Sequence, residues 1–102
     1  MDTLMKLQNK LVEFIADNNG LFRNFEHIYL FGSIVKGCSC PHDLDFLLTY
    51  SMYKDDIISN SNSITCLLEQ EFLLPVDLII LKKEELEGTN FLKKIKRYIV
   101  LK

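Results

Sequence analysis

The sequence has few cysteines, no long apolar run and no excess of basic residues, and each shortage excludes a class of protein. Its three cysteines are an odd number and no charged-then-apolar leader opens the chain, so we do not expect a secreted fold framed by disulfides. The longest apolar run, Phe72–Val76, contains Pro75 and falls far below the roughly 18 residues that a membrane span needs. We therefore expect a cytoplasmic protein with reduced thiols and no membrane contact.

Charge and length narrow the possibilities further. Lys and Arg total 12 against 14 Asp and Glu, so the chain lacks the positive excess that neutralises a phosphate backbone. We therefore do not expect a nucleic-acid partner. The 102 residues suit one domain, and they contain no internal repeat, linker or low-complexity segment. We treat residues 1–102 as a single domain.

The spacing of apolar residues predicts an α/β domain of the α+β kind. Leucines and aromatic residues recur at helical intervals near the start, and three later runs are rich in β-prone residues. The expected elements are a helix through Leu4–Ile15 that stops at residues 18–20, strands over 26–31, 43–48 and 76–81, a helix over 57–68 interrupted by polar residues 59–63, a charged and partly helical segment over 82–97, and a β-prone end over 98–101. This αββαβα order predicts a small mixed sheet flanked by helices.

Three aspartates stand beside apolar strand residues. Asp43 and Asp45 project from the same face of a strand, because side chains alternate between faces. Asp77 occupies the second position of the third strand, where an unpaired charge is costly. Clustered carboxylates raise one another's pKa unless a cation lies between them, and hard cations such as Mg²⁺ prefer oxygen ligands. Three converging carboxylates can bind two metal ions.

A glycine turn follows the first strand. Gly32 ends the strand abruptly, and Ser33 is a hydroxyl residue that can cap a short helical turn within the loop over 32–41. Backbone N–H groups at such a turn attract anions, Gly32 permits close approach of a phosphate, and Lys36 adds a positive charge. This segment is typical of a site for a nucleoside triphosphate.

These motifs occur at the spacing of a known family. The run over residues 30–48, with Gly32-Ser33, Gly37 and Asp43-Leu44-Asp45, resembles the signature of the DNA polymerase β-like nucleotidyltransferases. The length and the αββαβα order are similar to those of the minimal nucleotidyltransferase (MNT) domains, from the first helix to the last residue. His42 stands where family members often have a serine.

The resemblance implies a role for each of these residues. Asp43 and Asp45 would be catalytic metal ligands, and Asp77 would ligate the second of two Mg²⁺ ions and help to activate the acceptor hydroxyl. ATP would be the nucleotide substrate. The nucleotide-binding positions implied by the resemblance are Gly32, Ser33 and Lys36.

The resemblance also implies a partner. MNT domains of this size typically pair with HEPN-domain ribonuclease toxins, so the chain would be an antitoxin that transfers AMP from Mg-ATP to a tyrosine of its toxin. Two alternatives remain open: a non-catalytic antitoxin that neutralises its partner by binding, and a transferase acting on a small molecule such as an aminoglycoside. In these cases the chain would form a hetero-oligomer, or a homodimer with a pocket between subunits.

A zinc site is the competing interpretation of the loop. Cys38, Cys40 and His42 alternate along it, but zinc usually takes four ligands in spaced pairs and no second pair is visible. Cys66 falls on a predicted core helix, where cysteine acts as a small apolar residue. We expect His27 to be an ordinary strand residue, and we expect the lysines near the C-terminus to be solvated surface charges.

Overall fold

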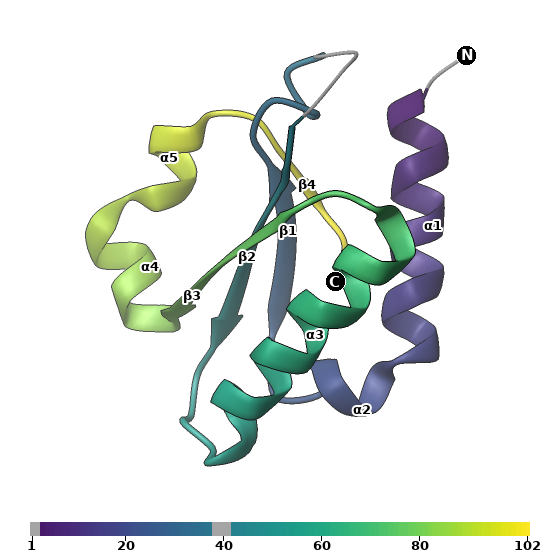
Figure 1. Cartoon of the computed structure of the whole chain (residues 1–102). Coiled ribbons are helices and arrows are strands. Elements are labelled where there is room, and N and C mark those ends of the chain that lie inside the picture. The colour runs from purple at the N-terminus through teal and green to yellow at the C-terminus, as the bar shows by residue number, and fades with distance from the viewer. Residues whose placement is uncertain (1–2, 38–41) are drawn as a thin grey trace.

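The structure, a computed structural model, describes residues 3–37 and 42–102 as nine helices and strands. Figure 1 shows these elements along the chain. Their bounds are α1 (Thr3–Asp17), α2 (Asn19–Phe22), β1 (His27–Phe31), β2 (Leu44–Tyr50), α3 (Asp56–Phe72), β3 (Val76–Lys82), α4 (Lys83–Thr89), α5 (Phe91–Ile95) and β4 (Tyr98–Val100). The predicted helices and strands are all present, with differences at their ends.

The four strands form one mixed sheet in the order β3-β2-β1-β4. β2 pairs in parallel with β3, whereas β1 pairs antiparallel with both β2 and β4. In Figure 1, α1, α2 and α3 cover one face of the sheet, and α4 and α5 lie on the other. The prediction of a small mixed sheet flanked by helices is therefore confirmed.

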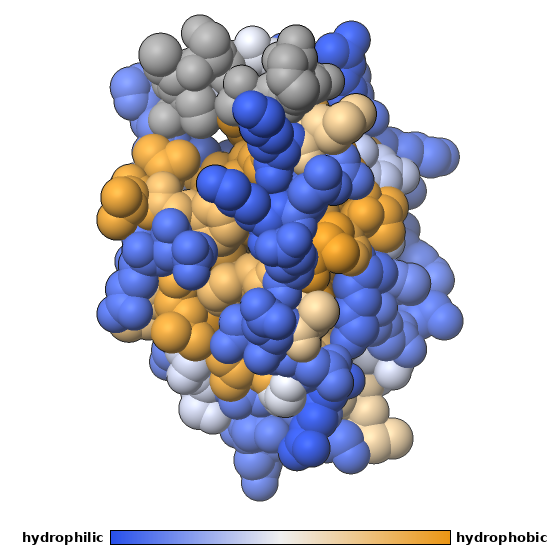
Figure 2. All heavy atoms as spheres, turned by 90° about the vertical axis from the view of Figure 1, so that its right-hand side faces the viewer, coloured by the Kyte–Doolittle hydropathy of each residue, from blue (hydrophilic) through white to orange (hydrophobic). Residues whose placement is uncertain are grey.

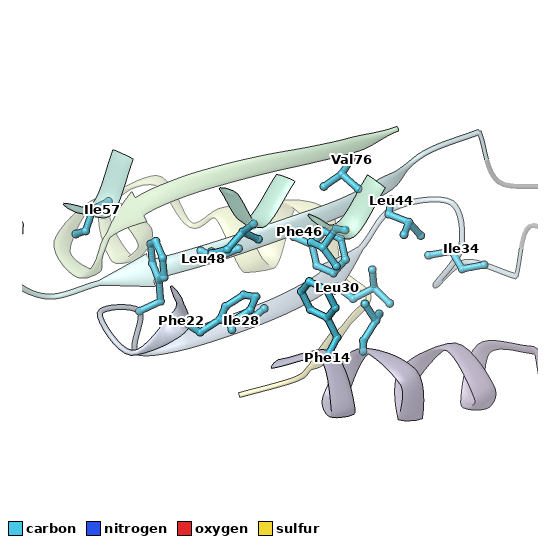
Figure 3. Packing of buried hydrophobic residues seen from close by; sticks show 14 residues of the cluster. Phe14, Phe22, Ile28, Leu30, Ile34, Leu44, Phe46, Leu48, Ile57 and Val76 are labelled. Atoms are coloured by element: carbon cyan, nitrogen blue, oxygen red, sulfur yellow. The ribbon is translucent and has the colours of Figure 1, made fainter. Parts of the chain in front are cut away.

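The main core lies between the sheet and the α1–α3 layer. Alternate residues of β2 point into it, and β1 supplies their register partners, with Ile28 opposite Leu48 and Leu30 opposite Phe46. Figure 3 shows these side chains meeting residues of the helices. The residues labelled there are Phe14, Phe22, Ile28, Leu30, Ile34, Leu44, Phe46, Leu48, Ile57 and Val76. Because this face of β2 is apolar, the other face is where its aspartate lies.

The predicted element order was incomplete. The short helix α2 begins within the predicted stop at residues 18–20, and four residues are too few to show a helical repeat in the sequence. The segment over 82–97 forms two helices, which Asn90 separates in a left-handed conformation with φ 54°. The β-prone end forms β4, which pairs with β1 as an edge strand.

Helix α3 runs unbroken through the polar stretch that was expected to weaken it. The hydroxyl of Ser61 donates to the backbone oxygen of Ile58 at 2.7 Å, and that of Thr65 donates to the oxygen of Ser61 at 3.1 Å. These bonds satisfy the hydroxyls on the helix itself. Ile57, Ile64 and Leu68 bury the apolar side of α3, so burial outweighs the weak helix propensity of the serines and asparagines.

The turn between α3 and β3 contains an unusual leucine. Leu73 adopts the left-handed region with φ 58°, a conformation that costs a non-glycine residue about 1–3 kcal/mol. Three hydrogen bonds hold this turn. Leu73 donates its backbone N–H to the oxygen of Glu69 at 3.0 Å, Val76 donates to Glu69 Oε2 at 3.0 Å, and Leu44 donates to the oxygen of Pro75 at 2.9 Å. The turn is therefore tied to both α3 and β2.

Two further expectations concern the surface. No helix in the described residues is both long enough and apolar enough to cross a bilayer. Cys66 lies on α3 as predicted, but its side chain is exposed, so its expected burial was wrong. Position 66 is two residues from both Ile64 and Leu68, which turns it away from the buried side of the helix. Cys38 and Cys40 lie outside the described residues.

Replacing a buried isoleucine of α3 should destabilise the domain. Ile64 is fully buried, so Ile64→Ala should lower the free energy of unfolding by about 2–5 kcal/mol through lost burial and a cavity. Ile58, on the same helix, is 56% exposed, and Ile58→Ala should change it by only about 0.5 kcal/mol. Urea unfolding followed by circular dichroism measures both. Equal losses would show that α3 does not pack on the sheet as described.

Candidate functional site

Three carboxylates converge at one edge of the sheet. Asp45 of β2 and Asp77 of β3 are direct partners in the parallel register, and Asp43 immediately precedes β2. One carboxylate oxygen from each of the three lies within 4.8 Å of the others. Asp43 and Asp45 are half-buried, and Asp77 is exposed. The predicted convergence of the three side chains is thus present, with the cluster open to solvent on the Asp77 side.

The cluster is electrostatically unfavourable when all three groups are ionised. Burial raises the pKa of the Asp45 carboxyl above its usual range, and the charges of Asp43 and Asp77 raise it further. A hydrogen bond between the side chains of Asp45 and Asp77 acts in the same direction. Each effect favours a proton on Asp45, and a cation would relieve the same repulsion. The donor set is oxygen only, which suits a hard divalent cation.

Gly32 lies directly against this cluster. It adopts φ +90°, a conformation that favours glycine, and Asp45 is the register partner of the preceding residue, Phe31. A Cβ built on Gly32 would overlap Asp45 Oδ2 and would lie 3.1 Å from Asp45 Cγ. Only a residue without a side chain therefore allows the Asp45 carboxylate to occupy its observed position.

The segment after Gly32 forms a tight helical turn. Val35 and Lys36 both donate their backbone N–H groups to the oxygen of Gly32 at 3.2 Å. Gly32 therefore occupies the capping position, and Ser33 is the first residue of the turn, which corrects the prediction that Ser33 caps it. The turn starts beside Asp45, as a phosphate site would require. Lys36 is exposed at the far end of the same turn.

An aromatic pair borders the cluster, and the sequence analysis did not identify it. The ring of Phe31, next to Gly32, meets that of Phe91 from α5 edge to face, with centroids 5.6 Å apart. Because Phe31 is the register partner of Asp45, this pair lies on the carboxylate side of the sheet. Phe91 lies 46 residues after Asp45 in the chain, so no local pattern connects it to the site. The one feature of the sequence that marks Phe91 is its position after Asn90, at the start of a short helix.

Neither histidine belongs to the carboxylate cluster. His27 begins β1, is exposed, and contacts the backbone oxygen of Lys102 through Nδ1 at 3.2 Å, as expected for an ordinary strand residue. His42 is exposed. Among the described residues, the one cluster of candidate metal ligands is that of the three aspartates. The zinc interpretation relied on positions 38 and 40, which are not described.

A mixed sheet with adjacent aspartates on two parallel strands, facing a glycine turn, is the architecture of a nucleotide-transferring domain. The sequence profile described as "Polymerase beta, Nucleotidyltransferase" matches residues 9–100. The chain belongs to this nucleotidyltransferase family. No curated protein sequence matches it significantly.

Solved structures share the fold. A structure of a mutant MntA–HpeT toxin–antitoxin complex has a chain that matches with a TM-score of 0.63 and 19% identity, over 93% of this chain and 72% of that one. A complex of a tri-AMPylated Shewanella oneidensis HEPN toxin with its MNT antitoxin gives 0.61 and 18%, over 98% and 72%. A nucleotidyltransferase from Sulfolobus solfataricus gives 0.52 and 20%, over 95% and 80%. At these identities the similarity establishes the fold.

Adding a methyl group at Gly32 should disrupt the cluster. Gly32→Ala should displace the Asp45 carboxylate, because the new Cβ would occupy its place. Gly37→Ala is a matched control, since Gly37 has φ +93° and a Cβ there would meet nothing within 4 Å. In both variants the free energy of unfolding should fall by about 1 kcal/mol, because alanine is strained at positive φ. Only Gly32→Ala should shift the NMR signals of Asp45, and equal shifts in the control would contradict this contact.

The raised pKa of Asp45 predicts a pH-dependent stability. Without metal, the folded protein holds this proton more tightly than the unfolded chain, so the stabilisation is complete below the ordinary aspartate pKa and is lost as the pH rises through the raised one. The Asp45→Asn variant has no carboxyl group at this position, so it should not show this loss of stability. In EDTA, the wild type should therefore lose more stability than Asp45→Asn between acidic and neutral pH, by urea unfolding. Asp55→Asn, an exposed control, should follow the wild type.

Proposed function

We propose that this chain, as one minimal nucleotidyltransferase domain over residues 1–102, transfers AMP from Mg-ATP to a hydroxyl group of a partner protein. The observation that carries the proposal is the cluster of Asp43, Asp45 and Asp77 against Gly32. Membership of the nucleotidyltransferase family supports the reaction class. ATP as the nucleotide and a protein as the acceptor are the parts that the experiment below tests.

The residues present fit a divalent metal. Their donors are all carboxylate oxygens, and they converge within 4.8 Å. Burial raises the pKa of Asp45, and repulsion from Asp43 and Asp77, which a cation would relieve, raises it further. Asp43, Asp45 and Asp77 would hold Mg²⁺, and the family resemblance implies that Asp77 would ligate a second ion. When bound, Mg²⁺ neutralises phosphate charge and aligns the attacking and leaving oxygens at phosphorus.

The chain's own residues would then position the reactants. Gly32 leaves space for a phosphate beside Asp45, and the N–H groups that open the turn at Ser33 would bind the triphosphate, with Lys36 as an additional positive charge. The acceptor oxygen bonds to the α-phosphorus, and the bond from that phosphorus to the bridging oxygen breaks. Pyrophosphate leaves with the electron pair. Asp77, the most exposed carboxylate, would accept the hydroxyl proton and pass it to solvent.

A HEPN-domain toxin is the partner that the comparisons support. Two of the structures with this fold are toxin–antitoxin complexes, and in one of them the HEPN toxin carries three AMP groups. By analogy, the chain would act as an antitoxin that modifies a tyrosine of its toxin. The open Asp77 side of the cluster is where a side chain of another protein can approach.

Transfer of labelled nucleotide tests this proposal. The purified chain is incubated with Mg²⁺, ATP labelled at the α-phosphate, and a purified HEPN-domain toxin (the HEPN protein). We expect label on the HEPN protein, and Asp43→Asn/Asp45→Asn should slow its appearance at least about a hundredfold, because the metal supplies several kcal/mol of transition-state stabilisation. Asp55→Asn, outside the cluster, should label at the wild-type rate.

The same variants separate catalysis from binding alone. If the double variant folds, binds the HEPN protein and no longer neutralises it, neutralisation requires transfer. If it still neutralises the HEPN protein, the chain acts by binding and the transfer proposal fails. Label from α-labelled GTP but not from ATP would overturn the choice of nucleotide only.

A further inference from the structure

A hollow of about 570 Å³ lies between α1 and α3, and its lining combines a few apolar residues with charged and polar ones; none of the three carboxylates of the cluster lines it. Phe14 of α1 and Leu67 and Phe72 of α3 line it. The rings of Phe14 and Phe72 meet edge to face, with centroids 6.3 Å apart. Figure 2, which faces α1, shows apolar surface on both sides of a hydrophilic band. We call these three residues the α1–α3 floor.

An exposed leucine stands next to this floor. Leu73 directly follows Phe72 in the chain, and its side chain is 83% exposed. Helices usually end with glycine or asparagine in this left-handed position, because a Cβ is unfavourable there. Glu69 holds the turn through its backbone oxygen and its carboxylate, so Leu73 is presented rigidly. The left-handed backbone at Leu73 is therefore strained, and burial of the leucine side chain does not offset this strain.

Two acidic residues on the rim of the hollow lie at the C-terminal ends of helices. Asp17 is the last residue of α1 and Glu71 lies in the last turn of α3, where a helix dipole disfavours negative charge. Neither last turn contains a basic residue. Within residues 3–37 and 42–102 the single ion pair joins Lys82 to Glu84, so both rim carboxylates lack a cationic partner. Glu13 adds a third acid to the rim, against one base, Lys10.

The hollow and the carboxylate cluster are neighbours through the α3–β3 turn. Asp77 lies five positions after Phe72, so their Cα atoms lie at most about 19 Å apart, from the 3.8 Å spacing of consecutive Cα atoms. The oxygen of Pro75 is bonded to Leu44, the residue after Asp43. A small-molecule acceptor at Asp77 would not reach the α1–α3 floor, whereas a protein can contact both.

We propose that the protein receiving the nucleotide docks on this surface with a basic, amphipathic segment. Its basic side chains contact Asp17 and Glu71, and its apolar side chains cover Leu73 and the α1–α3 floor. Docking there brings an acceptor hydroxyl within reach of Asp77. The inference rests on the proposed nucleotidyl transfer and adds to it the surface and the charge of the acceptor.

Binding measurements with surface variants test the docking site. Leu73→Asn and Glu71→Lys are made in the full chain, and the dissociation constant for the HEPN protein used in the labelling assay is measured by calorimetry. Each should weaken binding about tenfold, because each removes or reverses a contact at the surface. Neither should harm folding, since asparagine tolerates the left-handed region and lysine suits a helix C-terminus.

Matched controls change similar residues elsewhere. Ile58→Asn replaces an exposed apolar residue of α3 that lies about 22 Å along the helix axis from position 73. Glu87→Lys reverses an acidic residue in the last turn of α4, on the other face of the sheet. Both should bind the HEPN protein with the wild-type dissociation constant. Added salt should weaken wild-type binding more than binding by Glu71→Lys.

The outcomes separate docking from transfer. Unchanged affinity in Leu73→Asn and Glu71→Lys, or no binding by the wild type, overturns the docking surface whatever the labelling assay shows. Reduced affinity in these two variants and not in the controls supports it, even if the wild type transfers no label, in which case only the proposed reaction fails. The proposal of a protein acceptor is overturned by two results together. The HEPN protein does not bind, and an aminoglycoside is labelled by Leu73→Asn as fast as by the wild type.

Discussion

The parallel pairing of β2 with β3 is the constraint on which the site depends. Parallel strands bring corresponding ends to the same edge of a sheet, and the register here places Asp45 directly beside Asp77. Adjacent strands lie about 4.8 Å apart, so two carboxylates in register repel each other strongly. Apolar residues on the opposite face of the same strands offset this repulsion, among them Leu44, Phe46 and Val76. The core thus maintains a charge cluster that is unfavourable by itself.

The strands bear different side chains on their two faces, and this division creates the site. One face of β2 packs on α1 and α3, and the other carries Asp45 and, further along, the buried Leu47 and Thr49 beneath the smaller α4–α5 layer. Gly32 then admits the Asp45 carboxylate where any side chain would exclude it. Burial and like charge together raise the pKa of Asp45, and a cation at the cluster would relieve the like-charge repulsion.

The α3–β3 turn connects the carboxylate cluster to the proposed docking surface. The Glu69 side chain accepts the N–H of Val76, one residue before Asp77, while the Glu69 backbone oxygen accepts that of Leu73. One glutamate therefore holds both the strand that carries a carboxylate and the leucine that faces solvent. A protein bound at Leu73 would be in contact with the segment that positions Asp77, which would couple recognition of the acceptor to the geometry of the site.

Local patterns in the sequence were enough to select the candidate residues of the site. Alternation along a strand places Asp43 and Asp45 on one face, the abrupt end of β1 at Gly32 indicates a turn, and Asp77 takes the second position of a β-prone run. These features depend on short-range sterics and residue spacing. The prediction failed for Cys66, although its spacing from Ile64 and Leu68 turns it away from the buried side of α3. It also failed for α2, which is too short to show a helical period.

Tertiary structure alone decided what meets across the chain. The register that joins Asp45 to Asp77, the approach of Gly32 to Asp45 and the contact of Phe91 with Phe31 all depend on packing between segments that are 13 to 60 residues apart. No local preference specifies such contacts, since they follow from burying one common apolar face. The sequence by itself therefore indicated which residues are candidates for the site, and the fold determined that they lie close together.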